Sequence, residues 1–274
     1  MERVLVISPH AGLGNRVRSL CSALVLGEVL GRKVYHTWYD EPITSTIPRI
    51  QQLQRVGFSS LFQELIPRWT GGQVDTCYTE WMFGDYWYDS QSSGQQRFAK
   101  DIVPYAIGTD ASVLLSNVLS VILLETTLIV QIPDVPDWSE RMTVMYCRYF
   151  HPLSRYMERV PSLDIGVSVR RGDLLSYYPS ADQDLLAVAA WLVPRLQGKK
   201  AIILSDDIQV RKRLRIVLNC SCELDTNELE DWERGFVEFL TLSKCTTVYG
   251  TPCSSFAEEA ASFGGVVYMM LGVV

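Results

Sequence analysis

Hydrophobic residues in the second half of the chain fall into short continuous runs separated by segments with helical periodicity. The continuous runs predict buried strands, and the periodic segments predict the helices that connect them. The predicted strands cover residues 163–169, 200–204, 246–249 and 266–270, with a weaker one near residue 222, and the predicted helices cover residues 181–196, 208–218, 228–244 and 254–263. This regular alternation is typical of a doubly wound parallel sheet.

The first half begins with a similar unit. Residues 3–8 predict a strand, and apolar residues at helical spacing predict a helix from about residue 15 to residue 30, which Gly31 ends. A second strand is expected over residues 33–38. A strand, a helix and a second strand in this order favour parallel pairing.

The middle of the chain is less regular, because proline and glycine residues interrupt residues 40–110. Beyond this segment we expect a helix over residues 111–124, a strand over residues 127–132 and a short helix over residues 152–160. The predicted organisation is two Rossmann-like lobes, residues 1–150 and 151–274, with a cleft between them.

Composition limits the classes of function. The chain has 274 residues, which suits one large domain or two small ones. Hydrophobic residues make up 47% and charged residues 20%, as in ordinary globular proteins. The formal net charge is −6, so general nucleic-acid binding, which needs a basic face, is not expected. A local basic pocket for one small anion is compatible with this charge.

The cysteines, histidines and apolar stretches bear on metals and membranes. Seven cysteines include no Cys-x-x-Cys pair and the three histidines are far apart, so we expect no metal site. The chain starts with a predicted strand, not a signal peptide, and the apolar stretch of residues 113–124 is shorter than the roughly 20 residues that span a bilayer. We therefore expect a soluble, cytoplasmic protein without a transmembrane segment.

Four polar motifs follow predicted strands, where open α/β sheets bind their ligands. The first is Gly12-Leu13-Gly14-Asn15-Arg16, before the first helix. Glycine allows close approach of the backbone to a ligand, and the free N–H groups at a helix start favour an anion. A plain turn that needs glycine for its φ angle explains this motif at least as well.

The second motif runs from Val167 to Asp173 and contains two adjacent arginines. A guanidinium group matches phosphate oxygens and stays charged. Because successive side chains of a strand point in opposite directions, we assign the ligand contact to Arg170 and a supporting role to Arg171. The alternative is that both arginines pair with acidic residues on the surface.

The third motif is Ser205-Asp206-Asp207. A carboxylate here could bind a base edge or a ribose, or it could cap the helix that follows. One aspartate can cap while the other binds, so these two interpretations are compatible.

The fourth motif runs from Gly250 to Phe256. The hydroxyl and N–H groups of Ser254 and Ser255 could bind a phosphate at the helix start. The alternative is an ordinary capping box between Ser255 and Glu258.

These four motifs, in this order and spread over nearly the whole chain, resemble those of the GT-B fucosyltransferase superfamily, which includes the α1,2-, α1,6- and protein O-fucosyltransferases. The resemblance implies a GT-B-like α/β fold, with the second lobe on the nucleotide-sugar side and the first on the acceptor side. It also implies an inverting, metal-independent transfer of L-fucose from GDP-fucose to a glycan or glycoprotein acceptor. The GDP-sugar is a co-substrate, and no cofactor is implied.

The resemblance also suggests roles for individual residues. Arg170 resembles the arginine that holds the donor β-phosphate and stabilises the departing GDP, and Asp206 or Asp207 resembles the carboxylate that recognises guanine. Ser168 stands where several members have a histidine that contacts the nucleotide, which leaves guanine selectivity and the sugar open. The other donor-site residues would be Gly12, Gly14, Asn15, Arg16, Arg171, Ser254, Ser255 and Phe256.

The acceptor side is less defined. Asp173 is placed to act as the base for the acceptor hydroxyl, and orienting one of the arginines explains it about equally well. The aromatic residues between Tyr78 and Tyr88 could stack on sugar rings or pack in a core. Trp81, Asp85 and Trp87 are the acceptor-site residues predicted from this segment.

Other functions fit parts of the same pattern. The same fold could use UDP-xylose, GDP-mannose or a rhamnose donor, or the chain could bind a nucleotide or glycan without catalysis. An NAD-type oxidoreductase has limited support from Asp40 after the second strand, but residues 12–17 lack the third glycine of its motif.

Overall fold

The structure is a computed structural model, and it describes residues 4–9, 12–36, 38, 56–70, 76–77, 113–116, 138–172, 184–252 and 254–272. The chain divides into two compact units: the described residues up to His151 belong to the first, and those from Pro152 onward belong to the second. Within the described residues, each unit contains a four-stranded sheet in which all strand pairs are parallel.

The second unit is a doubly wound sheet with the strand order β6-β5-β7-β8. Its elements, in chain order, are α7 (Ser154–Met157), β5 (Ile165–Val169), α9 (Leu185–Leu196), β6 (Ala201–Ser205), α10 (Ile208–Val217), α11 (Asp231–Ser243), β7 (Thr247–Gly250), α12 (Ser255–Gly264) and β8 (Val267–Met270). The predicted strands and helices of this half are therefore confirmed, apart from shifts at their ends and the strand expected near residue 222.

The strand predicted near residue 222 is wrong. Residues 220–226 adopt no regular structure, although this segment runs close to the sheet and the Cys220 thiol lies 2.7 Å from the carbonyl oxygen of Ala201. The segment is mainly polar and has no run of apolar residues that would be buried on a sheet, so it gains little from strand pairing.

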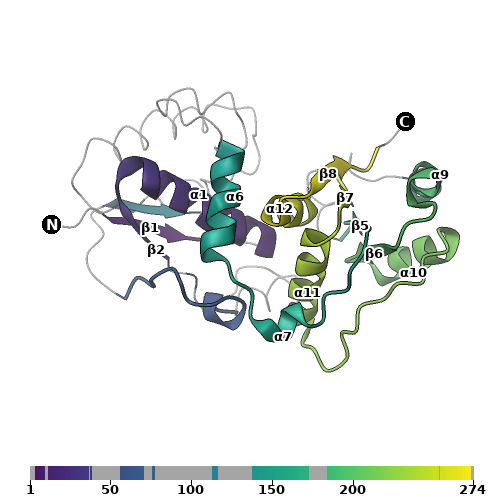
Figure 1. Ribbon diagram of the computed structural model, residues 1–274, viewed down its shortest axis with the longest axis horizontal. Helices are drawn as coiled ribbons and strands as arrows, with labels where there is room; N and C mark the ends of the chain where they lie inside the picture. The colour runs from purple at the N-terminus through teal and green to yellow at the C-terminus, as the bar shows by residue number, and fades with distance from the viewer. Residues whose placement is uncertain are drawn as a thin grey trace. The chain divides into compact units, whose positions relative to one another are not determined.

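The core of the second unit lies between the sheet and its helices. All five residues of β5 and of β6 are buried. The helices α9 and α10 pack on one face of this sheet, and α11 and α12 lie on the other side (Figure 1). A Cβ on Gly166 would lie 2.5 Å from a methyl carbon of Leu242, so glycine in β5 lets α11 approach the sheet closely.

The first unit has the strand order β2-β1-β4-β3. Its described elements are β1 (Val4–Ser8), α1 (Leu13–Leu30), β2 (Lys33–His36), the 3₁₀ turn η1 (Phe58–Ser60), β3 (Thr76–Cys77), β4 (Val113–Ser116) and α6 (Trp138–Tyr149). Gly31 ends α1 in the left-handed region with φ 62°, as predicted.

The first unit differs from the prediction in two places. The helix predicted over residues 111–124 is wrong at its start, because Val113–Ser116 form β4, which pairs with both β1 and β3. A short apolar run suits a helix and a buried strand equally well, and pairing with β1 decides the outcome. The helix α6 was not predicted, although its apolar residues recur at helical spacing as regularly as those of α9.

Candidate functional site

The three strand-end motifs of the second unit meet at one edge of its sheet. Arg170 follows β5, Asp206 follows β6 and Thr251 follows β7, and β5 lies between the other two strands. The N–H of Arg170 donates to the Thr251 hydroxyl at 2.9 Å, and the N–H of Thr251 donates to the Ser168 carbonyl at 3.1 Å. The predicted motifs are therefore joined by direct hydrogen bonds.

Asp206 fixes the turn that follows β5. Its two carboxylate oxygens accept one hydrogen bond each, from the N–H of Arg171 at 2.9 Å and from the N–H of Gly172 at 3.0 Å. The Oδ2 atom also lies 3.9 Å from Nε of Arg170. The carboxylate thus holds the backbone of the turn and faces the guanidinium group, whose side chain is 26% exposed.

Glycine at position 172 makes this arrangement possible. A Cβ there would lie 2.7 Å from Oδ2 of Asp206, closer than a carbon and an oxygen normally approach. Any larger residue would push the carboxylate away from the two N–H groups that it binds.

Asp207 has a different role from its neighbour. Its Oδ1 atom accepts hydrogen bonds from the N–H groups of Gln209 at 2.8 Å and Val210 at 3.2 Å, so Asp207 caps α10. Asp207 is therefore the cap that one of the two interpretations expected, and Asp206 lies beside Arg170. That Asp206 binds a ligand stays a prediction.

The helix α12 starts one residue earlier than a capping box between Ser255 and Glu258 would require. The helix begins at Ser255, its N-cap residue is Ser254, and no side chain caps it. The capping box between Ser255 and Glu258 is therefore wrong, since Ser255 already lies inside the helix. The Ser254 side chain is buried, and its hydroxyl has no hydrogen-bond partner among the described residues. Phe256 packs against Phe239, with 5.7 Å between ring centroids.

The first motif lies in the other unit, where Gly12 is the N-cap residue of α1. Its φ is −70°, which any residue can adopt, and a Cβ there would contact nothing within 4 Å. The explanation that this turn needs glycine at position 12 for its φ angle is therefore wrong. Gly14 is buried and Asn15 is half-buried. Arg16 is only 2% exposed, and its guanidinium lies over the Trp38 ring, 5.5 Å from the centroid.

A buried histidine supports the same region of the first unit. His36 ends β2, and its Nδ1 atom accepts a hydrogen bond from the N–H of Trp38 at 3.1 Å. Its Nε2 atom lies 3.2 Å from the Ile66 carbonyl, to which the neutral ring donates. Burial, opposed in part by that carbonyl and reinforced by Arg68, lowers the pKa of His36 to about 4. The imidazole is thus a neutral structural group, and it packs against the Phe58 ring.

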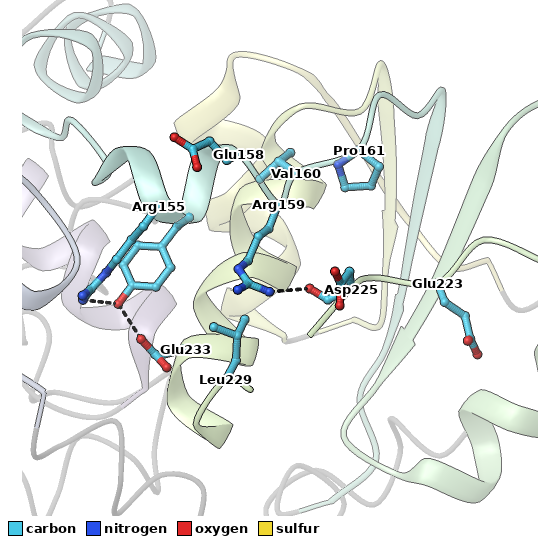
Figure 2. Close-up of a pocket in the computed structure, with 10 residues that line it drawn as sticks. Arg155, Glu158, Arg159, Val160, Pro161, Glu223, Asp225, Leu229 and Glu233 are labelled. Atoms are coloured by element: carbon cyan, nitrogen blue, oxygen red, sulfur yellow. Dashed lines mark hydrogen bonds between the residues drawn. The ribbon is translucent and has the colours of Figure 1, made fainter. Parts of the chain in front are cut away.

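A cavity of about 620 Å³ lies beside α7 and the start of α11 (Figure 2). Tyr156 donates to Oε1 of Glu233 at 3.0 Å and accepts from Arg155 at 2.7 Å. Burial and the Glu233 carboxylate raise the pKa of Tyr156 to about 12. The lining carries four carboxylates and two arginines, and it includes none of the predicted site residues. This balance does not suit a diphosphate.

Several predicted residues lie outside the described residues. Among them are Asp173, predicted as the base, and Trp81, Asp85 and Trp87, predicted for the acceptor. Asp40 also lies outside them. Their roles stay predictions from the sequence.

Comparison with solved structures gives the same architecture over almost the whole chain. A mutant of FUT1 from Arabidopsis thaliana in complex with GDP aligns with a TM-score of 0.59 at 13% identity, over 98% of this chain and 70% of that chain. The α-1,6-fucosyltransferase NodZ, known from Bradyrhizobium and co-crystallised with GDP, aligns with a TM-score of 0.56 at 15% identity, over 95% of this chain and 92% of that chain. POFUT1 in complex with GDP-fucose aligns with a TM-score of 0.55 at 12% identity, over 100% of this chain and 98% of that chain.

The chain has the fold of the GT-B fucosyltransferases. The α/β fold class predicted from the sequence is thereby confirmed, and so is the resemblance at the level of the fold. No protein-family model matches the chain, and no curated protein matches it. Strand-end motifs that resemble those of fucosyltransferases therefore occur on a fucosyltransferase fold although overall sequence identity is low.

Two further findings concern the described residues alone. None of the helices in these segments is both long enough and apolar enough to cross a bilayer. Within the same segments, no three His, Cys, Asp or Glu side chains are grouped so that they could hold a metal ion.

Proposed function

We propose that this protein is an inverting glycosyltransferase that moves L-fucose from GDP-fucose to a hydroxyl group of a glycan. The observation that carries the proposal is the anchored Arg170 at the carboxyl edge of β5. It supports the proposal because neighbours with this fold were crystallised with GDP or GDP-fucose. A partly exposed cation at this edge suits a diphosphate.

The chemistry explains why a fixed cation would matter. The acceptor oxygen forms a bond to the anomeric carbon of fucose while the bond from that carbon to the β-phosphate oxygen breaks. GDP leaves with the electron pair, so negative charge grows on the diphosphate in the transition state. Arg170 would stabilise that charge more strongly than the charge of the ground state. The N–H groups at the start of α12, beside Ser254, would add neutral donors.

The residues around Arg170 would position it or take part in the proton transfer. We assign Asp206 as a positioning residue, because it holds the turn after β5 and faces the Arg170 guanidinium. It keeps lone pairs with which it could also accept from guanine. Asp207 would act only through the cap of α10. In this proposal Asp173 accepts the proton of the acceptor hydroxyl, which no metal ion needs to activate.

A nucleotide panel tests the proposal. Thermal unfolding is followed with GDP, GDP-fucose, GDP-mannose, UDP, UDP-xylose and NAD. We expect GDP and GDP-fucose to raise the Tm, since a ligand at 100 times its Kd stabilises the folded state by about 2.7 kcal/mol. Stabilisation by UDP compounds alone would reject the guanine nucleotide. Stabilisation by NAD alone would favour the oxidoreductase.

Turnover separates an enzyme from a binding protein. Release of GDP from GDP-fucose is measured with a mixture of glycan acceptors and without them. We expect GDP release that increases with acceptor. Tight GDP binding without any turnover would show a nucleotide-binding protein without catalysis and would overturn the enzymatic part of the proposal.

A further inference from the structure

The outer surface of α9 and α10 has no role in the proposed reaction. These two helices pack against each other on one face of the second sheet (Figure 1). They bury Val188, Leu192, Val210 and Leu214 in the core that they share with β5 and β6. Their opposite sides face solvent, so side chains there do not contribute to that core.

Large apolar side chains are exposed on both helices. Half of the large apolar residues that are exposed in the described segments belong to these two helices. They are Leu186 (63% exposed) and Val193 (53%) on α9, and Ile208 (56%), Ile216 (80%) and Val217 (49%) on α10. Single exposed apolar residues are ordinary, but a group of them on adjacent helices indicates an interaction surface.

The charge of the same region is opposite to that of the protein. Residues 185–222 contain seven lysines and arginines but only two acidic residues, Asp206 and Asp207, and both precede α10. The whole chain has a net charge of −6. Neither helix contains an acidic residue after its N-cap, which is Asp184 for α9 and Asp207 for α10. Positive charge is therefore concentrated on α9, α10 and the short segment that leads from α9 into β6.

Not all of these cations are neutralised. Arg211 pairs with Glu238 at 3.1 Å, and Arg215 pairs with Glu223. Lys212 and Arg213 are exposed, and no carboxylate among the described residues pairs with either. The next cations available to an anionic partner are the exposed Lys199 and Lys200, which follow α9.

The spacing along α10 places apolar and basic groups together. Ile208, Lys212 and Ile216 are four residues apart, so they form one row along the helix. This row lies opposite the buried Val210 and Leu214. A partner that fits this row must therefore accept apolar side chains and also provide negative charge next to them.

We propose that this face, defined by Leu186, Val193, Ile208, Lys212, Arg213 and Ile216, docks on an anionic lipid bilayer. Apolar side chains of an interfacial helix enter the boundary between headgroups and acyl chains, and its lysines and arginines bind anionic headgroups. A second copy of the chain would bring cations against cations. A nucleic-acid backbone would leave the isoleucines without an apolar partner. The bilayer satisfies both kinds of side chain.

Vesicle flotation tests the docking. The purified protein is mixed with vesicles of phosphatidylcholine alone, or of phosphatidylcholine and phosphatidylglycerol in equal parts. We expect flotation only with the anionic vesicles, and less of it at high salt, because salt screens the headgroup charge. A protein that floats with neither kind of vesicle would overturn the proposal and indicate an acidic protein partner for this face.

Variants locate the binding surface. The double substitution Lys212→Gln, Arg213→Gln is expected to lower the partition onto anionic vesicles about tenfold, and Ile208→Gln with Ile216→Gln by a similar factor. All four side chains are exposed, so the thermal unfolding of both variants should match the wild type. A control removes two cations elsewhere, Arg148→Gln on α6 and Lys244→Gln after α11. An equal loss in this control would show attraction without a defined face and would contradict the proposal.

Discussion

The turns after β1 and β5 occupy equivalent places in the two sheets but are held in different ways. Each strand lies between the strand that follows it along the chain and a later strand, β4 for β1 and β7 for β5. After β5, the turn is held by polar groups, the Asp206 carboxylate and the Thr251 hydroxyl. After β1, the described residues lead into an uncapped helix whose Arg16 is buried over Trp38.

This difference indicates which of the two turns has a cation that a ligand can reach. In the second unit the cation is partly exposed and its anchors are side chains at the sheet edge. In the first unit the cation is buried over the Trp38 ring. Trp38 packs against Phe58, which in turn contacts the neutral His36. The stability of the first unit is therefore expected to depend on apolar packing around its buried groups. The stability of the turn in the second unit is expected to depend on the Asp206 carboxylate.

The largest expected effect is a selective loss of stability of the first unit in acid. The folded state holds the pKa of His36 at about 4, whereas the unfolded chain titrates near 6.5. Stability is therefore complete above pH 6.5 and falls as the pH drops toward 4, by about 3 kcal/mol. Hydrogen exchange of peptides from α1 and α11 between pH 7 and pH 4 measures the two units separately.

His36→Gln is the matched control for this prediction, because glutamine does not titrate. The variant should be less stable at neutral pH and should lose the extra pH dependence of the α1 peptides. If α1 and α11 lose protection in parallel in the wild type, the contrast between the two units is wrong.

The next effect concerns the carboxylate of the second unit. Asp206→Ala removes the acceptor of two N–H groups and the carboxylate beside Arg170, so we expect a loss of about 2 kcal/mol in unfolding free energy. We also expect GDP release to slow at least about tenfold, since the arginine is no longer positioned. Urea unfolding and the turnover assay measure the two effects.

The neighbouring aspartate provides the control. Asp207→Ala removes a helix cap and should cost about 1 kcal/mol of stability with little effect on turnover. Equal losses of turnover in the two variants would mean that Asp206 has no special relation to Arg170.

Two glycine substitutions compare the turns directly. Gly172→Ala places a Cβ against the Asp206 carboxylate and should destabilise the second unit by about 1 kcal/mol. Gly12→Ser adds a capping hydroxyl where space is free, and should stabilise α1 by about 0.5 kcal/mol. Thermal unfolding checks both signs. If Gly12 approaches the donor, as the family resemblance implies, Gly12→Ser should also weaken GDP binding.

The smallest expected effect is that of metal removal. Because the proposed reaction uses Arg170 and backbone donors in place of a metal ion, excess EDTA should leave the rate of GDP release unchanged. The rate is measured before and after dialysis against the chelator. A rate that falls with EDTA and returns with a divalent cation would require a different account of leaving-group stabilisation.

The sequence predicted the second sheet well, for a physical reason. Its strands β5 and β6 are continuous apolar runs that are buried along their whole length, so hydrophobicity alone locates them. The first sheet was harder, because β4 is a four-residue segment that becomes a strand only through its pairing with β1. The adjacent Asp206 and Asp207 show a similar limit. Which one faces Arg170 depends on the register that places Val169 beside Ser205, and this is a tertiary property.

The sequence predicted where the motifs of the site lie, but it did not predict the hydrogen bonds between them. The positions of Arg170, Asp206 and Thr251 follow from the rule that ligands bind at strand ends. The hydrogen bond from the Arg170 N–H to Thr251 joins residues 81 positions apart, which no local pattern shows. The burial of Arg16 over Trp38 likewise depends on the packing of α1 against the rest of its unit.

The central claim is that Arg170 stabilises a departing diphosphate. The most direct test compares GDP release from GDP-fucose by the wild type, Arg170→Ala and Arg170→Lys, with Arg213→Ala as a control at an exposed arginine of the same unit. We expect Arg170→Ala to lose at least about 100-fold in kcat/KM, Arg170→Lys to lose less, and Arg213→Ala to retain the wild-type rate. Wild-type turnover by a folded Arg170→Ala variant would contradict the account.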